Sequence, residues 1–289
     1  MSRLFIVLAI SALALATLAC GITINVPVDR IVTGPTQTDE IRVRFPDAKI
    51  AKLELSFGAG KLNLRPAEQG REYLVTGTAA YNVANFKPII TEKNESIRIS
   101  TGNVELTGFP SLNSKIENRW DLQIGKGLLD LVINSGAYQG DIELGGLELR
   151  SLEITDGAAD VRLRFSEPNP VEMERLLYQT GASNVQLFDL ANANFKSLTF
   201  RSGAGDYRLD FSGTLQREAV VSIESGLSQV VVIVPKGTPA KLFSSGGLLK
   251  INASGGWKKQ GGGYVLSGEG PGLTINVDMG AGNLELRTR

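Results

Sequence analysis

The sequence lacks histidine and contains one cysteine among its 289 residues. Without histidine there is no Ser-His-Asp or Cys-His arrangement, no imidazole acid–base chemistry and no His-ligated metal site. A single cysteine excludes an intrachain disulfide and any CxxC redox or zinc motif. Basic and acidic residues number 30 each, so no strong field favours nucleic acid or an acidic substrate. We therefore expect a protein that is not an enzyme and uses no cofactor or metal.

Glycine is abundant instead, with 33 residues spread along the chain rather than gathered in one linker. Hydrophobic residues make up 42% of the chain and charged residues 21%, a balance typical of a sequence that folds around a core. Scattered glycines between short apolar runs indicate many turns and short strands. The composition therefore favours an all-β fold in one large domain or two ordinary ones.

The first residues are typical of a bacterial lipoprotein signal peptide. Arg3 supplies a positive charge, Leu4–Ala19 is apolar and ends in small residues, and Cys20 follows. The apolar run is shorter than the roughly 20 residues of a spanning helix, and no basic cluster comes after it. The pattern predicts a signal peptide over residues 1–19 and lipidation of Cys20. An ordinary signal peptide cut at an alanine is the alternative.

Residues 20–40 are proline- and threonine-containing and are expected to form a lipidated tether. Two or three acyl chains would hold the mature protein stably, since each buried CH₂ contributes about 0.8 kcal/mol. The predicted location is therefore outside the cytoplasm, with the lipid in the bacterial cell membrane.

Seven units of the chain repeat the same order of parts: an alternating apolar run, a small-residue turn with glycine, and a second alternating run. Their turns are Gly58-Ala59-Gly60, Ser135-Gly136-Ala137, Asp156-Gly157-Ala158, Thr180-Gly181-Ala182, Ser202-Gly203-Ala204, Ser225-Gly226 and Gly280-Ala281-Gly282. From Gly136 to Gly226 the turns follow one another after 21, 24, 22 and 23 residues. A period of about 22 residues predicts a right-handed β-solenoid with glycine at its corners.

A β-sandwich also shows short strands separated by turns, and it stays the alternative fold. Residues 129–289 are expected to form the solenoid and residues 41–128 an irregular β domain that caps it. Strands are predicted in this cap near residues 73–76, 89–91 and 97–100. Arg287 and Arg289 are expected to blunt the C-terminal edge against pairing with other chains.

Two pairs of carboxylates flank the turns: Asp156 with Asp160, and Asp206 with Asp210. Stacked acidic turns would suit Ca²⁺, but no GGxGxDxUx run of a calcium-binding β-helix occurs. A carboxylate pair would also suit glycoside hydrolysis. Acids that are simply solvated at turns are the favoured interpretation.

A glycine-rich segment near the C-terminus contains Trp257, Lys258, Lys259 and Tyr264. The segment is typical of a protruding hairpin, whose aromatic and basic tip would grip glycan, peptide or lipid headgroups. A loop folded over the end of the solenoid is the favoured interpretation of these side chains. Trp120 is expected in the core or the cap.

The chain resembles the toast-rack family of bacterial envelope proteins, which are often lipoproteins. The resemblance rests on Leu53–Leu62, Val75–Asn82, Asn118–Leu122 and the glycine–alanine units through Phe165–Asn169, and it covers approximately residues 45–289. It implies a rack of stacked β-turns, an envelope location and suggested links to adhesion or envelope stress. It brings no catalytic residues.

We therefore expect a non-enzymatic envelope lipoprotein that acts as a surface scaffold or an adhesin-like binding module. An envelope-stress sensor or regulatory partner of a membrane protein is one alternative, and a carboxylate-based glycan hydrolase is another. The expected partners are the membrane, through the lipid anchor, and either cell-wall glycan or another envelope protein, but not nucleic acid.

Overall fold

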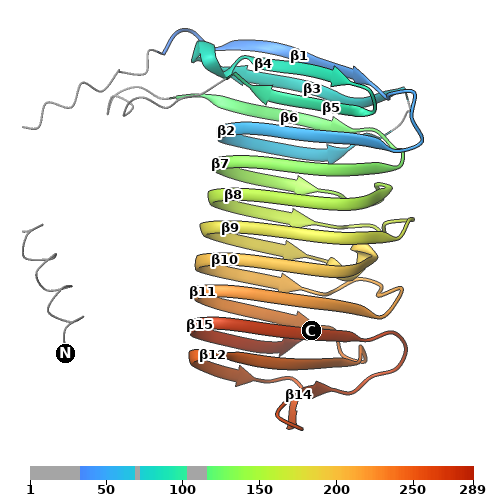
Figure 1. The fold of residues 1–289 in the computed structure, drawn as a ribbon, viewed down its shortest axis with the longest axis vertical. Coiled ribbons are helices and arrows are strands. Elements are labelled where there is room, and N and C mark those ends of the chain that lie inside the picture. The colour runs from blue at the N-terminus through green and yellow to red at the C-terminus, as the bar shows by residue number, and fades with distance from the viewer. Residues whose placement is uncertain (1–32, 69–71, 103–115) are drawn as a thin grey trace, which may run out of the picture. The chain divides into compact units, whose positions relative to one another are not determined.

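The computed structural model describes residues 33–68, 72–102 and 116–289, which lie in one compact unit. Their strands join in a single 15-stranded sheet (Figure 1), which confirms the all-β prediction. Two short 3₁₀ helices, Ala84–Phe86 and Leu190–Ala193, interrupt the strands. The predicted signal peptide and Cys20 lie outside the described residues.

The strands fall into three groups. The N-terminal group contains β1 (Gln37–Arg44), β3 (Tyr73–Tyr81), β4 (Pro88–Lys93), β5 (Ser96–Thr101) and β6 (Asn118–Ile124). The stacked group contains β2 (Ala51–Pro66), β7 (Leu129–Glu143), β8 (Leu149–Arg164), β9 (Met173–Phe188), β10 (Phe195–Asp210), β11 (Ala219–Val234), β12 (Ala240–Ala253) and β15 (Leu273–Thr288). The last two strands are β13 (Lys258–Gln260) and β14 (Gly263–Leu266).

The stacked strands form the solenoid that the repeats predict. Each is 14 to 16 residues long and bends at its glycine turn. Neighbouring strands pair in parallel, so each turn of one strand lies on the turn of the next. Parallel pairing of this kind, with one strand per repeat, excludes the β-sandwich alternative, whose strands would be antiparallel.

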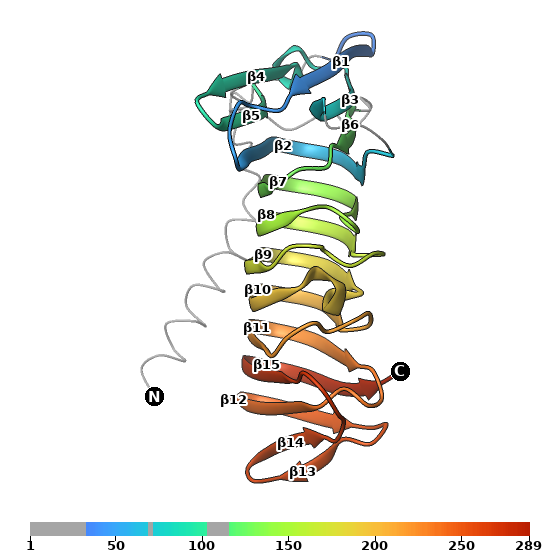
Figure 2. The ribbon, with the colours of Figure 1, turned by 90° about the vertical axis from the view of Figure 1, so that its right-hand side faces the viewer.

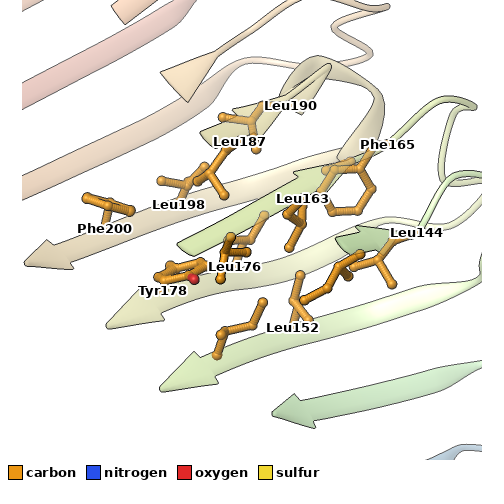
Figure 3. Close-up of a cluster of buried hydrophobic side chains, with 14 of the residues drawn as sticks. Leu144, Leu152, Leu163, Phe165, Leu176, Tyr178, Leu187, Leu190, Leu198 and Phe200 are labelled. Carbon is orange, nitrogen blue, oxygen red and sulfur yellow. The ribbon is translucent and has the colours of Figure 1, made fainter. Parts of the chain in front are cut away.

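The core lies inside the bend of the stacked strands. Buried and exposed residues alternate along each strand, so the buried ones stack from one strand to the next. One such column contains Leu152, Leu176 and Leu198, and the next contains Tyr178 and Phe200 (Figure 3). Full burial of such a side chain contributes about 1.5–3 kcal/mol, which makes these columns the main source of stability.

The turn glycines form a column of their own, which we call the glycine column: Gly58, Gly136, Gly157, Gly181, Gly203, Gly226, Gly280 and Gly247. A Cβ at Gly181 would lie 2.3 Å from the carbonyl oxygen of Gly157, and a Cβ at Gly226 would lie 2.5 Å from that of Gly203. The backbones of neighbouring corners therefore stack too closely for a Cβ, which explains why these positions are glycine. The positive φ angles occur elsewhere in the turn, as at Gly205 (φ 146°) and Gly282 (φ 135°).

The N-terminal strands continue the sheet rather than form a separate layer. β5 pairs with the first half of β2 and β6 with its second half, and β3 and β1 follow in antiparallel order. β2 itself pairs in parallel with β7, so the sheet runs unbroken across residue 128. The predicted tether is too long at its C-terminal end, because Gln37 already pairs with Tyr81 in β1.

The C-terminal strand does not form the end of the stack. β15 lies between β11 and β12 and pairs in parallel with both (Figures 1 and 2). The expectation that Arg287 and Arg289 blunt an edge is therefore wrong, because their strand is internal. β12 is also a full turn of the solenoid that the repeat pattern missed, since its corner reads Gly246-Gly247-Leu248.

Candidate binding surface

One column of polar side chains runs along the outside of the solenoid just past the corner. Each member stands three residues after its column glycine, and each is an amide or a carboxylate. We call this set the polar ladder: Gln139, Asp160, Asn184, Asp206, Gln229 and Asn283. Lys61 and Lys250 occupy the same position in the strands at its two ends.

The fold holds the ladder side chains in solvent at a regular spacing. All six are exposed, and neighbouring strands in a sheet lie about 4.8 Å apart. The carboxamide of Asn184 donates a hydrogen bond of 3.1 Å to Asp160. Within the described residues Gln139, Asp206, Gln229 and Asn283 have no side-chain hydrogen bond, so their donors and acceptors are free for a ligand.

A strip of small residues borders the ladder at the corner itself. The residue after each column glycine points outward and is alanine in most strands, as in Ala137, Ala158 and Ala204. In β11 and β12 it is leucine, and Leu227 and Leu248 are 67% and 83% exposed. The polar ladder is therefore edged by a smooth apolar strip that would not obstruct a long ligand.

The carboxylate pairs predicted beside the turns do not face a common site. Asp156 and Asp210 are only 6% and 0% exposed, whereas Asp160 and Asp206 are exposed in the polar ladder. Asp210 is held by Arg208 at 2.8 Å and by the hydroxyl of Ser212 at 2.6 Å. The interpretation that all four are solvated turn acids is thus wrong for Asp156 and Asp210, and no pair is arranged for glycoside hydrolysis.

Asp156 belongs to a buried polar cluster inside the corner. It accepts hydrogen bonds from the hydroxyls of Tyr178, at 2.8 Å, and Thr180. The hydroxyl of Ser183 in turn accepts from the backbone N–H of Ala159 at 2.9 Å. Burial raises the pKa of Asp156 and outweighs the lowering effect of these hydrogen bonds. Burial likewise raises the pKa of Tyr178 well above 10.0. The cluster is largely buried, and its hydrogen bonds join β8 to β9 at the corner.

The exposed aromatic tip predicted near the C-terminus is wrong for Trp257. This residue is only 7% exposed, and its indole N–H donates to the carbonyl oxygen of Arg287 at 3.4 Å. Tyr264 is half-buried against the core, while Lys258 and Lys259 are exposed. β14 pairs with Ala240–Leu242 of β12 (Figure 2), so the segment folds over the end of the solenoid. Trp120 is fully buried, as expected.

The described residues contain no group of three or more histidine, cysteine, aspartate or glutamate side chains placed to hold a metal ion. They also contain no helix of the length and apolarity needed to cross a membrane.

Sequence reasoning missed the polar ladder, although its signal was present. Aligning the repeats on the column glycine places amide or acid residues at the third following position in six strands. Each residue alone looks like an ordinary polar side chain near a turn. Only the parallel register shows that they are stacked neighbours.

The geometry defines a class, a parallel β-solenoid with glycine-stacked corners and a polar outer column. Residues 32–175 match the family model described as "N-terminal domain of toast_rack, DUF2154". The chain belongs to the toast-rack family. No curated protein matches the sequence.

Solved structures of similar fold come from several bacteria. A "putative cell adhesion protein" from Clostridium sporogenes is 20% identical, with 88% of this chain and 100% of that chain covered and a TM-score of 0.48. A "putative lipid binding protein" from Parabacteroides distasonis is 10% identical, with coverage of 88% and 99% and a TM-score of 0.41. A "putative adhesin" from Bacteroides fragilis is 10% identical, with coverage of 89% and 99% and a TM-score of 0.32.

Proposed function

We propose that this protein is a non-enzymatic binding module, displayed outside the cytoplasm, that holds extended glycan strands of the cell envelope in the manner of an adhesin. The observation that carries the proposal is the polar ladder. Its six amide and carboxylate side chains are exposed on successive strands, and four of them have no hydrogen-bond partner among the described side chains, so they can bind sugar hydroxyls. The names given to the Clostridium and Bacteroides proteins are in keeping with such a role.

A ladder of this kind suits a long ligand better than a small one. Its groups repeat about every 4.8 Å along a straight line, so a polymer with repeating hydroxyls can make similar contacts at each step. The backbone beneath is paired on both sides, so little order has to be gained on binding. Each contact is weak, and affinity comes from their number.

The proposed anchor is a lipid on Cys20, which would keep this surface at the cell. The support is the position of the chain's only cysteine directly after a small-residue stretch that ends an apolar run. Cells that express the wild-type chain should incorporate labelled palmitate into it, and cells with Cys20→Ala should not. Equal labelling of both chains would rule out this anchor.

The ladder is tested by sedimentation of purified residues 32–289, which we call the soluble domain, with insoluble cell-wall glycan. The triple variant Asp160→Ala, Asn184→Ala, Asp206→Ala should bind at least roughly tenfold more weakly, because three hydrogen-bonding contacts are lost. The matched control is Thr155→Ala, Gln179→Ala, Thr199→Ala, which changes outward residues of the same three strands on the other side of the corner. Equal binding by the ladder variant and wild type would refute the proposal.

A regulatory partner of a membrane protein is the second candidate function. It is favoured by the outer edge of Phe243–Ala253 in β12, with which no strand of the described chain pairs. Leu248 lies on this strand and is 83% exposed. This function predicts that an integral membrane protein co-purifies with wild type and with the ladder variant, but not with Leu248→Glu.

A further inference from the structure

A shallow hollow of about 310 Å³ lies on the other side of the corner from the polar ladder, near the end of the stack. Its walls come from the first halves of β11, β15 and β12, which are adjacent in the sheet. The ladder residues lie in the second halves of the strands, so the two surfaces share no residue.

The parallel register arranges six side chains of the hollow in two rows of three. Asn276 lies between Ser222 and Phe243, and Asp278 lies between Glu224 and Ser245. Of the intervening residues, Ile223 and Val277 are buried, and Ser244 of β12 is half-buried. Because side chains alternate along a strand, the six therefore point outward together.

An aromatic ring at the edge of this grid is exposed, which is unusual in this chain. Phe243 is 46% exposed, whereas Phe57, Phe165, Phe200 and Phe211 are all at most 1% exposed. A Cβ at Gly263 of β14 would lie 3.1 Å from the Phe243 ring, so the ring is supported from one side by the backbone of β14. It thus forms a fixed apolar wall rather than a loose side chain.

The polar groups beside this wall are available to a ligand. The side chains of Asn276 and Asp278 make no hydrogen bond or ion pair within the described residues, and both are exposed. Glu224 is paired with Arg201 at 3.0 Å, which leaves Asp278 as the uncompensated charge of the grid. The hollow therefore combines an aromatic wall, a free carboxamide, a free carboxylate and the hydroxyl of Ser222, while the hydroxyl of Ser245 donates to the carbonyl oxygen of Val277 at 3.5 Å.

We propose that this hollow is a subsite for a single sugar ring that is uncharged or carries an amine. The apolar C–H face of a sugar packs on Phe243, while Asn276 and Asp278 bond to its hydroxyls or amine. Acidic sugars are excluded because the uncompensated carboxylate of Asp278 repels a second anion. A hollow of this volume lies at the small end of ligand sites, which matches one ring rather than a chain.

The subsite adds a ligand class to the proposed function. It rests on that function only in taking the protein to bind glycan. Glycan bound along the ladder would meet the hollow only by crossing the corner. Failure of one surface therefore does not imply failure of the other, and variants of each surface separate them.

The test is saturation-transfer NMR and calorimetry of the soluble domain with three probes: tetramers of N-acetylglucosamine, of glucosamine and of galacturonic acid. The first two should bind and the third should not. Phe243→Ala and Asn276→Ala should each weaken binding roughly two- to tenfold, since an aromatic contact or a hydrogen bond contributes about 0.5–1.5 kcal/mol. Asp278→Asn should remove any preference for glucosamine over N-acetylglucosamine.

Two matched controls accompany these variants. Leu248→Ala removes an exposed apolar side chain from the same strand as Phe243, and Asn252→Ala removes an exposed amide beyond the corner. Both should bind as wild type, and the triple ladder variant should retain the binding that depends on Phe243 and Asn276. The subsite is refuted if wild type binds none of the sugars, if galacturonic acid binds best, or if Phe243→Ala and Asn276→Ala change nothing. Loss of binding in the ladder variant alone would place the sugar on the ladder instead.

Discussion

At the scale of single residues, the buried carboxylate of Asp156 is the most informative side chain. It accepts hydrogen bonds from the hydroxyls of Tyr178, Thr180 and Ser183 in a corner where it is only 6% exposed. Desolvation disfavours its charged form, so its pKa in the folded protein lies above the ordinary 3.8. A raised pKa means that the folded state binds a proton more tightly than the unfolded state does. Its contribution to stability is then largest in acid and is lost as the pH rises through the raised pKa.

This sign leads to a testable pH dependence. As the pH falls from 7 towards 4.5, the Tm of wild type should rise relative to that of Asp156→Asn, because only the wild-type side chain can take up the proton. Thermal unfolding followed by circular dichroism at a series of pH values measures it. Asp160→Asn, an exposed carboxylate on the same strand, is the matched control. A Tm difference for Asp156→Asn that is constant, or that moves the other way, contradicts the assignment.

At the scale of the structural element, the corner depends on the glycine column. Gly181 is the tightest of the members stacked between β7 and β11, because a Cβ there would meet the backbone oxygen of Gly157 at 2.3 Å. The residues that flank Gly157, Gly181 and Gly203 are held by the parallel pairing of β8, β9 and β10, so the Gly157 backbone cannot move away easily. Each corner therefore tolerates no side chain at this one position, while the next residue, such as Ala182, is exposed and unconstrained.

Gly181→Ala is therefore expected to destabilise the protein by roughly 1–3 kcal/mol, the usual cost of overpacking. Chemical denaturation of the soluble domain measures the free energy of unfolding. Ala182→Ser, at the adjacent exposed position, should change it by less than about 0.5 kcal/mol. If Gly181→Ala were as stable as wild type, the backbone contact would not be the reason for the glycine.

Elements of this kind were largely predictable from sequence, and the exceptions have physical causes. Alternating apolar residues and evenly spaced turns predicted the stacked strands β7 to β11 because inward-facing positions must be apolar in every turn of the solenoid. The repeat pattern misses β12 because Leu248 follows its column glycine, where most other strands have alanine. The sequence does not predict β1, because its first residues, from Gln37, are polar and exposed. They form a strand only through pairing with β3.

The candidate surfaces were less predictable for a related reason. The polar ladder and the hollow at Phe243 exist only through register between strands, and no local pattern encodes register. The prediction of an exposed tip at Trp257 is wrong because a tryptophan in a glycine-rich stretch looks exposed in the sequence. In the fold its indole is buried, and its N–H donates to the carbonyl oxygen of Arg287.

At the scale of the whole described unit, the unusual feature is the order of the last strands. β15 supplies a hydrogen-bonding partner along all of β12 and along nearly all of β11. Without it, β12 would keep only its short pairing with β14 over Ala240–Leu242. The C-terminal strand thus determines whether an earlier segment of the chain is ordered.

Removal of residues 273–289 should therefore expose the backbone of β12 while β8 stays protected. Hydrogen exchange measured by mass spectrometry should show amide protection in β12 falling by more than roughly tenfold, and little change in β8. A chain that lacks only Arg289 is the control. Retained protection of β12 in the long truncation would show that it can pair directly with β11, against the expectation.

The entry of β15 between two strands made earlier has a consequence for biosynthesis. The ribosome releases β11 and β12 before β15 has been translated. The two strands therefore lack their native pairing partner until residues 273–289 emerge. A chain whose synthesis stops early lacks this partner and leaves two strand edges open. Until residues 273–289 have been translated, the facing edges of β11 and β12 therefore stay open to any protease that meets the chain.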